Sequence, residues 1–335
     1  MNTKRIISLV ASLALVLSLS VGLTGCGDKA AQDDNQGSTD GEGTKYTVGI
    51  CQLVQHEALD AATQGFIDAL NEALPGQVEF QNKNASGDNA NCSTIVNGFV
   101  SDGVDLILAN ATGALTAAAA ATSDIPILGT SITAYGVALD IDDFNGTVGG
   151  NISGTSDLAD LEAQANMITE WFPDATKVGL LFCSAEPNSR YQIGEVAKCL
   201  SDKGIETKEF AFTDTNDVAS VTQSAADYSD VVYVPTDNTA ASNTEAIANV
   251  VIPEKVPVVA GEEGICKGCG VAALSISYYD LGYKTGEMAA EILADGADVS
   301  TMPVEFAPNV TKKYNAANCE ALGITPPDGY EAIAD

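Results

Sequence analysis

The sequence predicts an α/β protein with two similar lobes, each built on a parallel β-sheet. Strand-like and helix-like segments alternate along the chain from residue 45 onward. This alternation occurs in two series, and the second begins at Lys177. Residues 45–335 are long enough for two medium-sized domains with cores of their own. Alternation of this kind typically gives parallel sheets with helices on both faces.

The first series opens with a β-rich run over residues 46–53. A helix is expected over residues 57–74, where Leu59, Phe66 and Leu70 recur at helical spacing. The remaining elements of this series are strands over 78–81, 105–109 and 125–129 and helices over 89–100 and 112–122.

The second series has five strand-like runs, with helices expected between the first four. These runs cover 178–182, 206–212, 230–234, 256–260 and 271–276. The final stretch contains a helix over 278–293, a short strand over 304–306 and a helix over 315–322.

The final stretch predicts that the chain crosses between the lobes three times, near residues 153–155, 277 and 309. We therefore expect the first lobe to comprise residues 45–153 and 278–309. The second lobe would comprise residues 154–277 and 310–335. A binding site is expected in the cleft between them.

The N-terminus is typical of a secretory signal peptide. Lys4 and Arg5 precede an uncharged apolar run over residues 6–21, and Leu23-Thr24-Gly25-Cys26 follows. This ending resembles the bacterial lipoprotein box, in which the cysteine is lipidated. The alternative is an uncleaved membrane helix. We expect residues 1–25 to be the signal peptide and the protein to be held outside the cytoplasmic membrane by a lipid on Cys26.

A polar segment connects Cys26 to the first predicted strand. Residues 27–44 are rich in Gly, Asp, Ser and Gln and contain no aromatic residue. Such a composition is typical of a flexible linker, so residues 26–44 are expected to be a tether.

The chain is strongly acidic, with a formal net charge of −31 at pH 7. A surface of this charge is repelled by nucleic acid, so nucleic acid is not expected as a partner. No further long apolar segment follows the N-terminal one, and we expect the remainder to be a soluble monomer.

Eight cysteines are present, and seven remain if Cys26 carries lipid. An odd number leaves at least one free thiol and argues against a disulfide scaffold. Four of them lie in predicted strands or helices, where a thiol behaves as a small apolar residue: Cys51, Cys92, Cys183 and Cys199.

The Cys266-Lys267-Gly268-Cys269 element permits a local disulfide or inert thiols, redox chemistry, or half of a zinc site. A zinc site needs a second ligand pair, and the sequence offers none. The element falls in a Gly-rich connection between two predicted strands rather than at the helix N-terminus that redox motifs occupy. We expect no metal, no cofactor and no catalytic residues.

Polar residues follow the predicted strands, where ligands of open α/β sheets bind. The positions chosen by this rule are rich in hydroxyls, amides and carboxylates and nearly devoid of cations. Such a lining suits a small ligand with an ammonium group, and helix N-termini would receive a carboxylate. The strand-end set contains Gln52, Gln55, His56, Glu57, Asn110, Thr112, Thr130, Ser131, Ser156, Asp157, Ser184, Glu186, Asn188, Ser189, Thr236, Asp237, Asn238, Glu262 and Glu263.

Each of these positions also has a purely structural interpretation. Thr112, Ser156 and Ser189 precede or begin helices and would serve as N-caps, which is compatible with ligand binding. His56 is the only histidine in the chain, so multi-histidine metal sites are excluded. We interpret His56 as a hydrogen-bonding wall residue rather than a general base.

At these positions the chain resembles the extracellular solute-binding lipoproteins of ABC importers, and in particular the branch that binds tryptophan and other aromatic amino acids. The resemblance extends from Tyr46 to about Thr325. It is carried by QHEALD from Gln55, NAT from Asn110, GTSD from Gly154, YVPTDNT from Tyr233 and YYDLGY from Tyr278.

The resemblance implies a type I periplasmic-binding-protein fold, with two Rossmann-like lobes joined by three crossover strands. It implies that a ligand, with Trp, Tyr or Phe favoured, is delivered to a permease and its ATPase without chemical change. Asp237 would hold the ligand's ammonium, and Thr112, Ser156 and Asn188 its carboxylate. The predicted set of ligand-binding polar residues is Gln55, His56, Thr112, Ser156, Asp157, Asn188, Thr236, Asp237 and Asn238.

Two features depart from the family pattern. Glu57 stands where relatives commonly carry proline, and many relatives lack the Cys-Lys-Gly-Cys element. The aromatic residue that would stack on a ligand ring is open among Tyr135, Tyr191, Tyr278 and Tyr279. A nucleoside, a sugar or another small solute remains the alternative ligand, and a thiol oxidoreductase that uses Cys266 and Cys269 is the third hypothesis.

Overall fold

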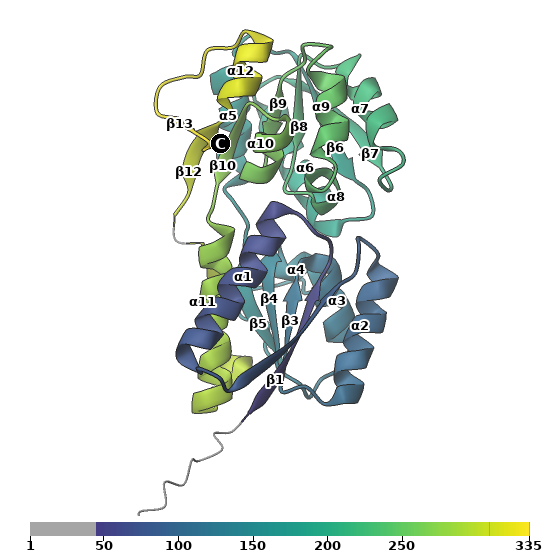
Figure 1. Cartoon of the computed structure of the whole chain (residues 1–335). Helices are drawn as coiled ribbons and strands as arrows, with labels where there is room; N and C mark the ends of the chain where they lie inside the picture. The colour runs from purple at the N-terminus through teal and green to yellow at the C-terminus, as the bar shows by residue number, and fades with distance from the viewer. Residues whose placement is uncertain (1–44, 308, 335) are drawn as a thin grey trace, which may run out of the picture. The chain divides into compact units, whose positions relative to one another are not determined.

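The computed structural model describes residues 45–307 and 309–334, and the expected signal peptide, linker and lipidation site at Cys26 lie outside this part of the chain. Two β-sheets organise the described residues (Figure 1). We call each sheet with its helices a lobe.

The first sheet has the strand order β11-β5-β4-β3-β1-β2, and all its neighbouring strands are parallel. Its strands are β1 (Tyr46–Gln52), β2 (Val78–Asn84), β3 (Leu106–Asn110), β4 (Ile127–Ile132), β5 (Ile152–Ser156) and β11 (Glu305–Phe306). The helices of this lobe are α1 (Glu57–Ala73), α2 (Asn89–Asp102), α3 (Thr112–Ala121), α4 (Tyr135–Ala138), α11 (Tyr278–Asp295) and the 3₁₀ helix η1 (Val299–Thr301).

The second sheet has the order β13-β12-β10-β9-β8-β6-β7, and only the β10–β12 pair is antiparallel. Its strands are β6 (Lys177–Cys183), β7 (Glu206–Phe212), β8 (Val231–Val234), β9 (Val258–Ala260), β10 (Ala272–Ser275), β12 (Thr311–Tyr314) and β13 (Glu331–Ala332). The helices are α5 (Leu161–Trp171), α6 (Pro187–Asp202), α7 (Val218–Ala226), α8 (Asn238–Ala241), α9 (Thr244–Val251), α10 (Glu263–Cys269) and α12 (Ala316–Leu322).

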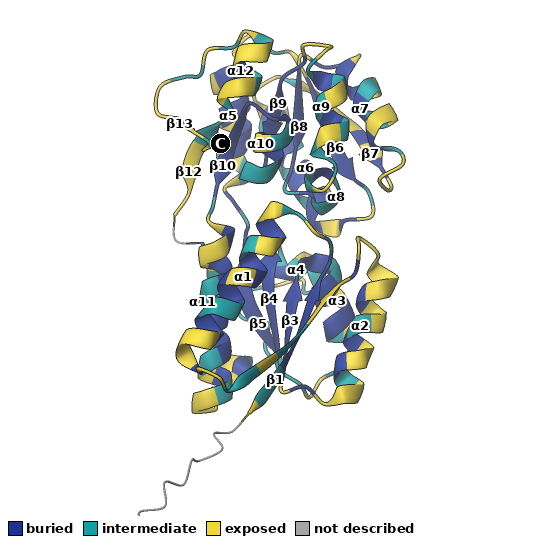
Figure 2. Cartoon of the chain, viewed as in Figure 1, coloured by how far each residue is buried: buried dark blue, intermediate teal, exposed yellow. Residues whose placement is uncertain are grey.

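Each sheet has an apolar core on both faces, as expected for parallel strands covered by helices (Figure 2). In the first lobe, Ile50 and Leu108 face Phe66 of α1 and Met288 of α11. The opposite face packs against α2 and α3, for example through Phe99. This two-sided burial explains why the central strands are continuous apolar runs.

Helix α11 follows the second lobe in sequence but packs against α1 of the first. Glycines allow this close approach: a Cβ on Gly282 would lie 1.9 Å from the carbonyl oxygen of Ala62, and one on Gly65 would lie 2.1 Å from that of Tyr279. Larger side chains here would force the helices apart, so these glycines fix the return of the chain to the first lobe.

The chain passes between the sheets after Ser156, between Ser275 and Tyr278, and between Phe306 and Thr311. All of β5 pairs in the first sheet, so residues 154–156, which the sequence assigned to the second lobe, lie with the first sheet. We keep the division into two lobes as a proposal, with its first boundary moved to Ser156.

Several elements differ from the expected ones. The sequence placed no helix between the last two strands of the second series, but α10 lies there and contains the Cys-Lys-Gly-Cys element. Strand β4 continues to Ile132 rather than ending at residue 129. Among the described residues, no helix is long and apolar enough to cross a membrane.

Candidate functional site

A small pocket, with a cavity volume of ≈ 10 Å³, lies between the two sheets at the carboxyl ends of their strands. Residues from both lobes and from the starts of α1 and α11 line it. The lining comprises His56, Leu59, Ser131, Thr133, Asp157, Asn188, Thr236, Asp237, Asn238, Ala241, Glu262 and Tyr278. Three of these residues are acids and none is a lysine or arginine, so the pocket favours a cationic group.

Asp157 directly follows β5 and is 5% exposed. The hydroxyl of Tyr278 donates a 2.9 Å hydrogen bond to Oδ2 of Asp157. Oδ1 is buried and has no hydrogen-bond partner among the described residues. Burial raises the pKa of Asp157, although the hydrogen bond from Tyr278 opposes the shift. Asp157 therefore presents an unsatisfied acceptor to the pocket.

Asp237 follows β8 and caps the N-terminus of α8. Its two oxygens accept backbone N–H bonds, Oδ2 from Cys183 at 2.6 Å and Oδ1 from Ala240 at 2.8 Å. Burial raises the pKa of Asp237 to about 8, and repulsion from Glu186 acts in the same direction. Asp237 thus combines a structural cap with a place in the pocket wall.

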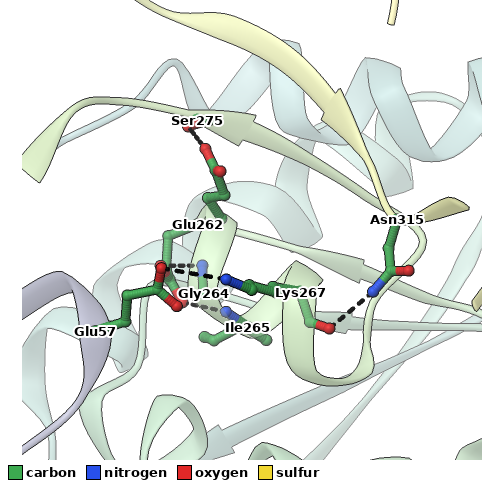
Figure 3. A network of polar contacts seen from close by, with 8 residues as sticks. Glu57, Glu262, Gly264, Ile265, Lys267, Ser275 and Asn315 are labelled. Carbon is green, nitrogen blue, oxygen red and sulfur yellow. Dashed lines mark hydrogen bonds and ion pairs between the residues drawn. The ribbon is translucent and has the colours of Figure 1, made fainter. Parts of the chain in front are cut away.

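Glu262 follows β9 and caps α10 in the same way (Figure 3). It accepts N–H bonds from Gly264, at 2.7 Å, and from Ile265. Burial raises the pKa of Glu262 to about 7, and repulsion from Glu57 and Asp157 contributes. Two buried carboxylates are therefore held in place by the first turns of short helices.

A direct contact joins the two lobes at the pocket. Nε2 of His56, at the start of α1, lies 3.3 Å from Oδ1 of Asn238. The Nδ2 of Asn238 donates to Glu186 at 2.7 Å, which leaves Oδ1 as the acceptor for the imidazole N–H. Burial lowers the pKa of His56, so the ring is neutral at pH 7. This agrees with the interpretation of His56 as a wall residue.

Two further polar atoms of the lining are buried without partners among the described residues, Ser131 Oγ and Asn188 Oδ1. Ser131 lies in the β-bulge of β4 with φ of 57°, a left-handed conformation that is strained for a non-glycine residue. Strain of this kind is often maintained at ligand sites.

The structure gathers six of the nine predicted site residues around this pocket. They are His56, Asp157, Asn188, Thr236, Asp237 and Asn238. Gln55 is exposed and lies outside the pocket lining. Thr112 lines a neighbouring cavity, and Ser156 lines another while donating a hydrogen bond to the carbonyl of Thr133.

Six lining residues were absent from the predicted site set. Ser131 and Glu262 were strand-end positions, and Tyr278 was one of four tyrosines considered for stacking. Thr133 was missed because β4 is longer than expected, which makes Thr133 the first residue after the strand. Leu59 and Ala241 carry no polar signal and would not be found from sequence.

The surroundings of Cys266 and Cys269 do not favour redox or nucleophilic chemistry at these two thiols. Both thiols are fully buried and free, and burial raises the pKa of each thiol. Raised thiol pKa values oppose thiolate formation, which nucleophilic and redox cysteines require. No group of three or more metal-ligating side chains occurs in the described part of the chain.

Comparisons with known proteins agree with this architecture. A family described as ABC transporter substrate binding protein matches residues 47–335. A tyrosine-binding protein of Clostridioides difficile is 35% identical over 315 residues, covering 90% of this chain and 88% of the relative.

Two solved structures extend the comparison. An ABC domain from Streptococcus pneumonia in complex with L-Trp is 30% identical, covers 87% of this chain and 100% of its own, and superposes with a TM-score of 0.82. The ligand-free, open structure of a substrate binding protein with adhesive properties from Clostridium difficile is 34% identical. The match covers 86% of this chain and 99% of the other chain, with a TM-score of 0.65. With its two parallel-stranded lobes in the type I periplasmic-binding-protein arrangement, the chain belongs to the ABC transporter substrate-binding proteins.

Proposed function

We propose that this chain binds an aromatic amino acid in the interlobe pocket and releases it unchanged to a membrane permease. The observation that carries the proposal is the unpaired, buried Oδ1 of Asp157 in a pocket without lysine or arginine. The relatives named for tyrosine and solved with L-Trp support the ligand class.

Asp157 is the proposed partner of the ligand's ammonium. An ionised carboxylate and an ammonium form a strong charge-assisted hydrogen bond, and burial of the acid is tolerated when that partner arrives. Asp237, the partner expected from the resemblance, already accepts one N–H bond at each oxygen. We therefore assign Asp237 a supporting role, in which an arriving ammonium favours the ionised form of Asp237 and is attracted by it.

The ligand's carboxylate is proposed to bind the hydroxyls of Ser131 and Thr133. Ser131 Oγ is buried without a partner among the described residues and can donate to an anion. The aromatic ring would lie against Leu59, Ala241 and the ring of Tyr278. Of the four tyrosines considered for stacking, Tyr278 is the one in the pocket lining.

The described conformation corresponds in our proposal to a closed form, whose small pocket must widen to hold the ligand. The His56–Asn238 contact between the lobes supports this, because opening the cleft would break it. The greater similarity to the L-Trp complex than to the ligand-free, open relative also supports it. Closure around a ligand is a hinge motion of the kind described for periplasmic binding proteins.

We further propose that the protein is exported by the signal peptide and anchored by a lipid on Cys26. The family's extracytoplasmic role supports this location. The residue pattern Leu23 to Cys26 and the polar linker that follows are the sequence observations behind it.

A thermal-shift screen of residues 45–335 against amino acids, nucleosides and sugars tests the ligand class. A ligand at 100 times its Kd adds about 2.7 kcal/mol to the free energy of unfolding. Stabilisation by Tyr, Trp or Phe supports the proposal, whereas a hit confined to a sugar or nucleoside contradicts it.

The role of Asp157 is tested with Asp157→Asn, which should weaken amino-acid binding tenfold or more. Asp68→Asn is the matched control. Asp68 also accepts a hydrogen bond from a tyrosine, Tyr279, at 3.0 Å, but lies at the surface away from the pocket. An equal loss of affinity in both variants would contradict the assignment of Asp157.

A further inference from the structure

Asn188 lines the pocket and a neighbouring cavity, and its side-chain amide has an orientation that its own surroundings fix. It lies in the first turn of α6 and is 4% exposed. Its Nδ2 lies 3.2 Å from Oε2 of Glu186, 3.3 Å from Oγ of Ser189 and 3.3 Å from the carbonyl oxygen of Thr236. Its Oδ1 is buried and has no hydrogen-bond partner within the described residues.

The amide of Asn188 cannot be reversed without loss. Reversal would place Oδ1 against the carboxylate of Glu186 and the carbonyl of Thr236, both of which are acceptors. The Thr236 carbonyl also accepts from Gln192 at 2.9 Å, so it is held in place. Consequently the atom of the Asn188 amide that has no partner among the described residues is an oxygen, which needs a donor and cannot bind the ligand's carboxylate.

The ammonium of the ligand has charged acceptors available elsewhere in the pocket. Asp157 has an oxygen without a partner among the described residues, and Asp237 and Glu262 are two further carboxyl groups in the lining. A cation prefers these carboxylates to a neutral amide oxygen. The oxygen of Asn188 is therefore left for a neutral donor on the ligand.

We propose that Asn188 Oδ1 accepts a hydrogen bond from the side chain of the ligand, either a phenol O–H or an indole N–H. This inference rests on the proposed function and narrows it: the site selects amino acids whose aromatic side chain carries a donor. Phenylalanine fills the same space but leaves the amide oxygen buried and unpaired. An unpaired buried acceptor corresponds to a loss of affinity of about tenfold to a hundredfold.

The first test uses the unaltered protein and isothermal titration calorimetry. Tyr is compared with Phe and with 4-aminophenylalanine, which keeps a donor at the same position, and Trp is compared with 1-methyltryptophan. We expect binding of Phe and of 1-methyltryptophan to be at least tenfold weaker than that of their parents, and 4-aminophenylalanine to stay within tenfold of Tyr. Equal affinities for the donor and donor-less members of both pairs would overturn the inference.

The second test assigns the preference to Asn188. Asn188→Leu removes the acceptor, and the Kd ratio of Phe to Tyr should fall to near one. Asp157→Asn is the control: it should weaken Tyr and Phe by the same factor and leave the ratio unchanged. A ratio that persists in Asn188→Leu overturns the inference. The proposed function fails separately, and only if neither Tyr, Trp nor Phe binds at all.

Discussion

Glu57 and Lys267 form an ion pair between the lobes, with 3.5 Å from Oε1 of Glu57 to Nζ of Lys267 (Figure 3). Glu57 begins α1 of the first lobe, and Lys267 lies in α10 of the second. Asn315 holds the Lys267 segment by donating a 2.7 Å hydrogen bond to its carbonyl oxygen.

The ion pair predicts a small contribution to ligand retention. Opening of the cleft separates the two charges, so Glu57→Gln should speed ligand dissociation. Both side chains are substantially exposed, 68% for Glu57 and 43% for Lys267, and exposed pairs contribute about 0.2–1 kcal/mol. We therefore expect dissociation to be up to about fivefold faster, as measured by stopped-flow fluorescence.

The matched control for this prediction is Glu287→Gln. Glu287 pairs with Lys284 at 3.4 Å at similar exposure, but both residues lie on α11. This control should leave dissociation unchanged, and the difference between Glu57→Gln and the unaltered protein should shrink at high salt. Equal rates in both variants would contradict a role for the interlobe pair.

The buried carboxylates predict that the ligand-free protein loses stability as the pH rises from about 5 to about 8 and then levels off. The pKa values of Glu262 and Asp237 rise to about 7 and about 8 in the folded state. A raised pKa favours folding most below the unfolded value near 4, and this stability is lost as the pH rises through the folded value. The lowered pKa of His56 acts in the opposite direction, but mainly below pH 6.5.

Urea denaturation at a series of pH values measures this effect. We expect a decline on the order of 1 kcal/mol per pH unit. Asp237→Asn should flatten the decline, even though loss of one N–H bond lowers stability overall. A decline with the same slope in Asp237→Asn would show that another group titrates.

The sequence predicted most of the fold because apolar runs and helical spacing are local signals. It missed α10 because Gly264, Gly268 and two cysteines weaken the helical pattern there. The cap of α10 is Glu262, a residue outside the usual set of N-caps. Tertiary packing of Ile265 and both cysteines into the core stabilises this helix instead.

The sequence predicted where the site lies, at the ends of the strands, but not which of the polar side chains there line the pocket. Ser156 and Asp157 are neighbours after the same strand, yet Asp157 lines the pocket and Ser156 hydrogen-bonds to Thr133. Thr112 likewise follows a strand but faces a different cavity. Which polar side chains face the ligand depends on strand length and on the packing of the lobes, and neither is encoded locally.

The cysteines predict a simple pattern of thiol reactivity. Residues 45–335 contain seven free cysteines, and all but Cys199 are buried. Ellman's reagent should therefore label one thiol in the folded protein and seven after denaturation. Five reactive thiols under denaturing, non-reducing conditions would indicate a disulfide and contradict the free state of Cys266 and Cys269.

The hydrogen bond between Tyr278 and Asp157 predicts that loss of the Tyr278 hydroxyl weakens ligand binding. Because this hydrogen bond is 2.9 Å long and both residues are buried, the hydroxyl stabilises the ionised carboxylate. Tyr278→Phe removes this donor, so the pKa of Asp157 should rise further and amino-acid binding at pH 7 should weaken about threefold to thirtyfold. Calorimetry across pH 6–8.5 should show the loss of affinity shrinking as the pH rises, because higher pH restores the ionised acid.

Tyr279→Phe is the neighbouring control for this prediction. The Tyr279 hydroxyl donates to Asp68 on the surface, and the side chain is 40% exposed. Its removal should change neither affinity nor the pH profile. If Tyr278→Phe binds with unchanged affinity at every pH, Asp157 does not need this hydroxyl to hold its charge, and the role given to the Tyr278–Asp157 hydrogen bond is wrong.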